Sequence, residues 1–475
     1  MFRLASNASV RLIPAMTEPL GEGAPASDRG RSRLLGATVV IGTFAVCLIR
    51  LVGFVQANAV DLLCEDQWDF LQPLFAGRGP WACFFWQHGP HRQGLGGLVD
   101  WCLFNATGWD VRAEAWAAVV VLSLATVVAI SLAARLRGHL SWSDAAFPLL
   151  LLGPIHWETM IYTPNLAHSI LPLLFALLLA HAWGPAGPVT RVLGVGVFGT
   201  LTLFTGYGSC GAPVTVGLAL LLWLRPGNGE TPVDRRQIVL ILLMLGVAAV
   251  VFAHGYHWDR GTPGWRFPVP NWWDYPRFCA LMFTSLVGWR AISVASAGVG
   301  FVMLGLVVAA FLTAATAIWR RDATPRSRVV WILTGTSLLY VALTALGRLP
   351  ITLQAAFMWR YVTLMMPAVC GLALAAEGWA ISRRVRFRLG IAVAWLTLAG
   401  VIWSDFKPED HAAILAKGKN VWIANYLRTH DMEAANQAAD FSVYSPAPAS
   451  PVIAGRLRWL EQQHLSFFRI PPDKQ

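Results

Sequence analysis

Long apolar blocks alternate with short polar segments along almost the whole of this chain. A helix needs about 20 consecutive apolar residues to cross the roughly 30 Å of hydrocarbon in a bilayer. Blocks of this kind lie at 34–56, 113–134, 143–155, 165–183, 191–206, 210–224, 237–254, 297–318, 329–346, 361–381 and 389–404. The pattern predicts an all-α integral membrane protein with about eleven transmembrane helices, in a range of roughly 10 to 13.

The composition excludes a soluble globular protein. Of 475 residues, 56% are hydrophobic and only 13% are charged, whereas soluble domains carry about 25% charged residues. The mean hydropathy is +0.53. Two shorter apolar stretches, 94–107 and 276–291, are open to two interpretations, as interfacial helices or as re-entrant segments.

Arginine clusters between the blocks orient the chain, because cytoplasmic loops of membrane proteins carry an excess of Lys and Arg. They are Arg135 and Arg137, then Arg225 with Arg235 and Arg236, then Arg320, Arg321, Arg326 and Arg328, and finally Arg383, Arg384, Arg386 and Arg388. All of them lie inside if 276–291 does not cross, so we expect that segment to be a helix on the outer face. The predicted orientation has a cytoplasmic N-terminus and an extracytoplasmic C-terminus.

Three regions follow from this topology. Residues 1–33 are polar and rich in Pro and Gly, which predicts a disordered cytoplasmic tail. Residues 34–404 form the transmembrane domain, whose first extracytoplasmic loop is 57–112, and 405–475 form a small extracytoplasmic region with helical patches. The net charge of +11 is explained by cytoplasmic arginines and anionic lipid. We expect the bilayer as a partner and no nucleic acid.

The first outer loop is unusually acidic. Asp61, Glu65, Asp66 and Asp69 lie within nine residues, just past the first block. Such carboxylates can serve as a general base, or Glu65 and Asp66 can hold a divalent ion such as Mg²⁺ or Mn²⁺. The alternative is a solvated acidic loop without chemistry.

The same loop carries two histidines and two cysteines. Pro90 separates His88 from His91, so a helix cannot place both on one face. We expect them to hydrogen-bond a substrate or the carboxylates, with a metal pair as the alternative. Cys64 and Cys83 lie where an oxidising compartment permits a disulfide, and otherwise they are small apolar thiols.

Further polar residues recur at the predicted outer face. Arg348 and Arg360 oppose the inside bias of positive charge, so they are candidates for binding an anionic headgroup, or else they extend to the interface. Glu158, in His156-Trp157-Glu158-Thr159, lies near hydrocarbon. Its carboxylate has either a functional role or a structural role as a hydrogen-bond acceptor. The segment 206–213, with three glycines, predicts a tight turn more than a binding loop.

Taken in order, these motifs resemble a known family. Its pattern covers Asp66-Gln67-Trp68-Asp69-Phe70-Leu71, His88 through Arg92, Trp157-Glu158, Gly347-Arg348, Arg360-Tyr361 and the tail from Trp459 to Phe468. The family consists of uncharacterised bacterial multi-span proteins and is similar to the GT-C superfamily of glycosyltransferases. The motifs are short one by one, and their order and spacing carry the resemblance over most of the chain.

The resemblance implies a GT-C-like fold, a bacterial cytoplasmic (inner) membrane as the location, and a membrane glycosyltransferase that inverts the sugar's configuration. Its donor would be a sugar linked to polyprenyl phosphate, and its acceptor an envelope glycan, lipid or protein on the outer face. The catalytic carboxylate would be Asp66, or Glu65 or Asp69, because the adjacent acids read Glu65-Asp66 here rather than two aspartates. The implied substrate-binding residues are His88, His91, Arg92, Glu158, Arg348, Arg360 and Tyr361.

Two other function classes are considered. A transporter or flippase of a lipid-linked or anionic substrate favours ionisable residues in mid-span, whereas most charges here lie at the predicted faces. A non-catalytic partner in envelope polysaccharide assembly has no need of the acidic site, which this chain contains. Both observations favour the enzyme.

Overall fold

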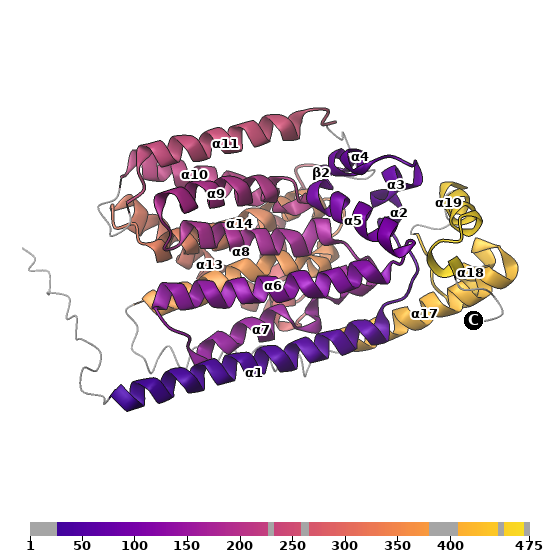
Figure 1. Ribbon diagram of the computed structural model, residues 1–475, viewed down its shortest axis with the longest axis horizontal. Helices are drawn as coiled ribbons and strands as arrows, with labels where there is room; N and C mark the ends of the chain where they lie inside the picture. The colour runs from indigo at the N-terminus through magenta and orange to yellow at the C-terminus, as the bar shows by residue number, and fades with distance from the viewer. Residues whose placement is uncertain (1–25, 227–231, 258–265, 380–406, 445–450, 470–475) are drawn as a thin grey trace, which may run out of the picture.

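The computed structural model describes residues 26–226, 232–257, 266–379, 407–444 and 451–469 (Figure 1). These residues are helical almost throughout, and their only strands form the hairpin of β1 (Gln87–His88) and β2 (His91–Arg92). Eight segments of the described chain are long and apolar enough to cross a membrane. The prediction of an all-α, multi-pass membrane protein is therefore confirmed.

The eight candidate spans include five long helices and three that begin with irregular turns. They are α1 (Ala26–Asn58), α6 (Arg112–Arg137), Leu166–Trp183 with α8 (Leu171–Trp183), Gly206–Leu224 with α10 (Gly211–Leu224), α11 (Arg235–Ala253), α13 (Val294–Trp319), α14 (Pro325–Arg348) and Trp359–Gly378 with α15 (Met366–Gly378). Since α1 begins at Ala26, residues 26–33 are helical rather than disordered, and 1–25 lie outside the described residues.

Three of the eleven predicted blocks are not long helices of the described chain. Block 191–206 corresponds to α9 (Pro188–Leu203), a shorter helix of 16 residues. Block 143–155 holds only α7 (Ala146–Leu151), which is flanked by 3₁₀ turns at Trp142–Ala145 and Pro154–His156. Block 389–404 lies outside the described residues.

Although α7 is short, the chain from Asp144 to Leu166, which contains it, extends along the full length of α6. Arg137, the last residue of α6, forms an ion pair of 3.0 Å with Asp144. Glu114, in the first turn of α6, accepts a hydrogen bond from the backbone N–H of Leu166 at 3.1 Å. The chain between Asp144 and Leu166 therefore returns from one end of α6 to the other, although prolines interrupt its helix.

Helix α12 (Asp274–Thr284) corrects the expectation for 276–291. Its eleven residues rise by only about 16 Å, so it cannot span a membrane alone. It does not lie on the surface either, because Phe278 and Ala280–Thr284 are buried. Gly300 of α13 permits the close approach, since a Cβ there would lie 2.0 Å from the Ala280 carbonyl oxygen.

The bundle has two chemically different ends, separated by the length of α14. We define the arginine end by the ion-paired group Arg137, Asp144, Arg326 and Glu377. We define the loop end by the other end of α14, at Arg348, where residues 59–111 and the C-terminal residues are found (Figure 1).

The loop and the tail form one unit at the loop end rather than two separate pieces. We call it the extramembrane unit, because none of its helices is among the candidate spans. The loop contributes α2 (Gln67–Phe70), α3 (Gln72–Phe75), α4 (Pro80–Phe85) and α5 (Gly94–Thr107). The tail contributes α17 (Pro408–Thr429), α18 (Met432–Ala439) and α19 (Pro451–Gln462) (Figure 1). Their buried side chains, including Trp68, Trp109, Trp422 and Leu457, make a hydrophobic core distinct from that of the bundle.

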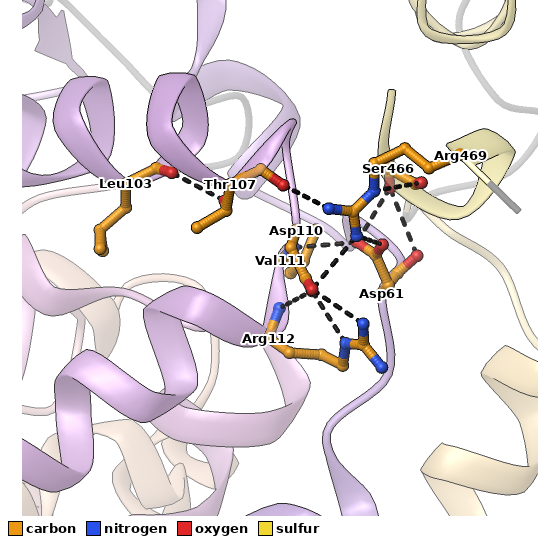
Figure 2. A network of polar contacts seen from close by, with 8 residues as sticks. All are labelled: Asp61, Leu103, Thr107, Asp110, Val111, Arg112, Ser466 and Arg469. Carbon is orange, nitrogen blue, oxygen red and sulfur yellow. Dashed lines mark hydrogen bonds and ion pairs between the residues drawn. The ribbon is translucent and has the colours of Figure 1, made fainter. Parts of the chain in front are cut away.

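A polar network fastens the last described residues to the loop (Figure 2). The Arg469 guanidinium lies 2.7 Å from an oxygen of Asp61 and 3.1 Å from one of Asp110. The Ser466 hydroxyl donates to Asp61 at 3.1 Å, and the Val111 N–H donates to the same Asp61 oxygen at 2.9 Å. Burial and the nearby Asp110 raise the Asp61 pKa, and the Val111 N–H and Arg469 oppose the rise. Asp61 is therefore a structural member of the acidic loop.

Candidate functional site

The acidic residues lie on a tight turn at the start of α2. Glu65 has φ 52°, in the left-handed region, and the Gln67 N–H donates to the Cys64 carbonyl at 3.2 Å. The Gln67 side chain is 1% exposed. It accepts from the Cys64 N–H at 3.1 Å and donates to Glu114 and to the Pro164 carbonyl, each at 3.2 Å. Gln67 thus fixes the turn to two segments of the bundle.

The three carboxylates of this turn have different partners. Glu65 accepts a hydrogen bond from the Tyr162 hydroxyl at 2.8 Å. Asp69 accepts one from the Tyr444 hydroxyl at 2.9 Å and lies 3.6 Å from the Arg456 guanidinium. Within the described chain, the half-buried Asp66 carboxylate makes neither a hydrogen bond nor an ion pair. Of these three carboxylates, Asp66 is therefore the one with both oxygens open to a bound molecule in the described chain.

The tail supports the turn from the side of the extramembrane unit. The Glu65 N–H donates to the Val443 carbonyl at 2.8 Å. Lys419 of α17 is fully buried, and its ammonium donates to the carbonyls of Ile161 and Tyr162 at 2.9 and 3.0 Å. Burial lowers the Lys419 pKa, while the neighbouring Cys64 and Glu65 favour its charge.

The tyrosines that hold two of the acids remain donors at neutral pH. Burial, followed by the nearby Cys64 and Glu65, raises the Tyr162 pKa above its ordinary value. Burial and the hydrogen bond to Asp69 raise the pKa of Tyr444 to about 12. Both phenols therefore stay protonated and keep Glu65 and Asp69 occupied as acceptors.

Two neighbouring arginines lie at the loop end of the bundle. Arg348 ends α14, and Arg360 lies in the 3₁₀ turn Trp359–Tyr361. Glu158 accepts a hydrogen bond from the Arg360 backbone N–H at 3.0 Å and lies 3.7 Å from its guanidinium. Asp66 is also within electrostatic range of Arg360.

Arg348 has a different environment from Arg360. Among the described residues, no carboxylate lies within ion-pair distance of Arg348. Its guanidinium lies in the electrostatic range of Tyr361, Tyr207 and Arg360. Glu158 thus pairs with Arg360 only, and Arg348 has no carboxylate partner in the described chain.

The histidine hairpin completes the wall of the site. β1 and β2 place His88 directly opposite His91. The His91 ring lies 4.1 Å from the ring of Tyr207 and 5.3 Å from that of His168. Burial, then Arg348 and His88, lowers the pKa of His91 to about 3. His91 is therefore a neutral hydrogen-bonding group rather than a cation at neutral pH.

Arg92 and Tyr361 differ from the other predicted substrate-binding residues. The Arg92 guanidinium is buried and donates to the carbonyls of Phe252, Phe85 and His254 at 2.9, 2.6 and 2.5 Å. These contacts favour a structural role that ties the hairpin to the end of α11. Tyr361 is buried beside the two arginines, and within the described chain its hydroxyl has no hydrogen-bond partner.

Sequence reasoning missed three contributors to the site. Tyr207 lies in the glycine-rich segment that we expected to be only a turn, and this segment is a 3₁₀ turn, Gly206–Cys210. His168 interrupts an apolar block, and its polarity was the available signal. Lys419 is one charge among many in a polar tail, so nothing in the sequence indicated its burial.

Glu65 and Asp66 are the pair that we expected to hold a divalent ion. The described residues contain no group of three or more His, Cys, Asp or Glu side chains placed to hold a metal ion. Glu65 accepts a hydrogen bond from Tyr162, whereas the Asp66 carboxylate makes none in the described chain. A divalent ion at this pair stays a prediction.

Cys64 and Cys83 are both buried free thiols, so the disulfide that the sequence allowed is not formed. Burial raises their pKa values to about 12 and about 11, respectively. Both are therefore small apolar side chains of the loop. Comparison with known proteins finds no family model, no curated protein and no solved structure that matches this chain.

Proposed function

We propose that this protein is a membrane glycosyltransferase that moves a sugar from a polyprenyl-phosphate donor to a hydroxyl of an envelope acceptor. One observation carries the proposal: the Asp66 carboxylate has no partner in the described chain and lies in the electrostatic range of Arg360, whose neighbour Arg348 has no carboxylate partner there either. A base beside an anion-binding position is what sugar transfer from a lipid phosphate requires.

The residues fit an inverting displacement. Asp66 takes the proton of the acceptor hydroxyl while that oxygen forms a bond to the anomeric carbon. The bond from this carbon to the phosphate oxygen breaks, and its electron pair leaves with the lipid phosphate. Arg348 and Arg360 stabilise the added negative charge, and charge stabilisation of this kind contributes strongly in sites that exclude water.

The neighbours of these residues have positioning roles in the proposal. Glu158 holds the backbone and guanidinium of Arg360, and Gln67 holds the turn that carries Asp66. The neutral His91 and the hydroxyl of Tyr361 provide hydrogen bonds for sugar hydroxyls. Glu65 and Asp69, which are held by tyrosines, orient the turn and do not take the proton.

We further propose a GT-C-like topology with the loop end outside a bacterial inner membrane and the arginine end in the cytoplasm. The arginine end carries most of the positive charge between spans, which favours the cytoplasmic side. Eleven crossings result if the broken segment around α7, α9 and the block at 389–404 each cross.

A native residue tests this orientation. Cys102 is the exposed cysteine among the seven, and it lies in α5 of the loop. An impermeant maleimide should label it in cells whose outer membrane has been made permeable, and Cys102→Ser removes the signal. Labelling that appears only after the inner membrane is broken contradicts the topology.

The activity itself is tested with the purified full chain in detergent. The substrate is a radiolabelled sugar on polyprenyl phosphate, and the product measured is released polyprenyl phosphate. The proposal predicts acceptor-dependent release. A transporter or flippase leaves the sugar attached to its lipid, so translocation in proteoliposomes without release contradicts the proposal.

A further inference from the structure

A cavity lies in the extramembrane unit, where loop and tail meet. Its volume is about 450 Å³, within the range of roughly 300–1,000 Å³ typical of ligand pockets. Three indoles line it: Trp101 of α5, Trp109, which follows α5, and Trp459 of α19. None of the residues assigned to the transfer chemistry lines this cavity.

The wall of the cavity is aromatic, and its edge is polar. Trp109 and Trp459 pack edge to face, with ring centroids 5.2 Å apart, so their positions are fixed. At the edge, the Asn105 side-chain amide donates to the Trp101 carbonyl at 2.7 Å. The side-chain oxygen of Asn105 can therefore accept a hydrogen bond from a ligand. The exposed Arg78 also lines the cavity.

This combination suits a pyranose sugar. The electron-rich face of an indole attracts the polarised C–H groups on one side of a sugar ring, while Asn105 and Arg78 can bind hydroxyls around its edge. An acyl chain leaves these polar groups without partners, at a cost in free energy.

The charge of the cavity narrows the class of sugar. No carboxylate lines it, and among the described residues no acidic group pairs with Arg78. A guanidinium without a counter-ion favours a ligand that carries a carboxylate or phosphate.

We propose that this cavity binds an acidic pyranose residue of the glycan acceptor, at a distance from the reacting hydroxyl. The evidence for binding of the sugar comes from the cavity alone. The role of that sugar as part of the acceptor rests on the proposed glycosyltransferase function. A polymeric acceptor held in the same extramembrane unit as Asp66 would remain bound while its end enters the site.

One substitution blocks the cavity without removing any packing. Gly79 lines it with φ −73°, which any residue adopts, and a Cβ built there meets no atom within 4 Å. Gly79→Leu therefore adds side-chain volume to the wall. Gly455→Leu is the matched control, since its Cβ is equally unobstructed and it lies on α19 outside the cavity.

The experiment is isothermal titration of the full chain in detergent, without donor. The probes are a hyaluronan tetrasaccharide, which carries glucuronate, and the neutral cellotetraose. The wild type should bind the acidic probe more tightly. Gly79→Leu should weaken its binding about tenfold or more, and Gly455→Leu should leave it unchanged. Arg78→Gln should weaken the acidic probe about fivefold and leave the neutral one unaffected.

The outcomes separate the two proposals. Binding that persists in Asp66→Asn, together with lost transfer, supports both. If the wild type binds the acidic probe but transfers no sugar, the cavity remains a sugar-binding site and the acceptor role is overturned. The sugar site is overturned if neither sugar binds saturably, or if Gly79→Leu and Gly455→Leu bind the acidic probe with equal affinity. Equal affinities of Arg78→Gln and the wild type for the acidic probe overturn its acidic character.

Discussion

The two ends of the bundle carry charged groups of similar composition but with different pairing. At the arginine end, Arg137 pairs with Asp144 at 3.0 Å and also contacts Glu377, while Arg326 lies 3.5 Å from Glu377. At the loop end, Glu158 is the one carboxylate within ion-pair distance of either arginine in the described chain, and the nearby Asp66 has no such partner.

This difference separates structural charge from charge available for chemistry. Paired groups satisfy one another, and breaking such a pair mainly costs stability. A half-buried charge without a partner costs free energy in the folded protein, so its presence favours a role with a ligand. We therefore expect substitutions at the loop end to change turnover and substitutions at the arginine end to change stability.

The largest effect is expected for Asp66→Asn. The amide keeps the shape of the side chain and removes its basicity, so turnover should fall by about two to four orders of magnitude with little change in donor binding. Since the carboxylate makes no bond in the described chain, the melting temperature should stay near that of the wild type. Near-normal turnover together with a large loss in Asp69→Asn or Glu65→Gln would assign the base to another carboxylate.

The next effect is expected for Arg348→Lys. A lysine keeps the charge, but it lacks the planar fork that binds phosphate through two hydrogen bonds. Catalytic efficiency should fall by about ten- to a hundredfold, with the melting temperature nearly unchanged. Full activity and donor affinity in both Arg348→Lys and Arg360→Lys would show that these arginines only anchor the helix ends at the interface.

A smaller change in activity and a larger change in stability are expected for Arg137→Gln at the arginine end. The variant leaves Asp144, whose side chain is 1% exposed, without its ionic partner. Unfolding should become easier by about 3 kcal/mol, measured as a lower melting temperature in detergent. Turnover per folded molecule should match the wild type, and a selective loss of turnover without destabilisation would break the comparison between the two ends.

The sequence predicted the class of the protein and most of the helices, because apolar blocks report directly on the hydrocarbon they cross. It failed at α7 and α12, where prolines and packing against other helices decide the outcome rather than hydropathy. The sequence also could not predict which residues contact Glu65 and Asp69. Tyr444 and Lys419 are far from the turn in sequence, and only the fold brings them to Asp69 and to the Tyr162 carbonyl.

The arginines show the same limit. Their position against the charge bias was visible in the sequence, but their pairing was not. The sequence did not decide whether Glu158 makes a structural hydrogen bond or takes part in the chemistry. In the structure it accepts a hydrogen bond from the Arg360 backbone, which positions that arginine. For Arg92, the run of histidine and arginine suggested ligand binding, whereas its three carbonyl partners lie on neighbouring segments.

The most direct test of the central claim is chemical rescue of Asp66→Ala with formate. Removing the side chain leaves space where a small carboxylate can act as the base. We predict that the variant is nearly inactive in release of polyprenyl phosphate and partly recovers with increasing formate, whereas Asp69→Ala shows no recovery. Substantial turnover of Asp66→Ala without formate, or the same recovery with chloride at equal ionic strength, would contradict the assignment of Asp66 as the catalytic base.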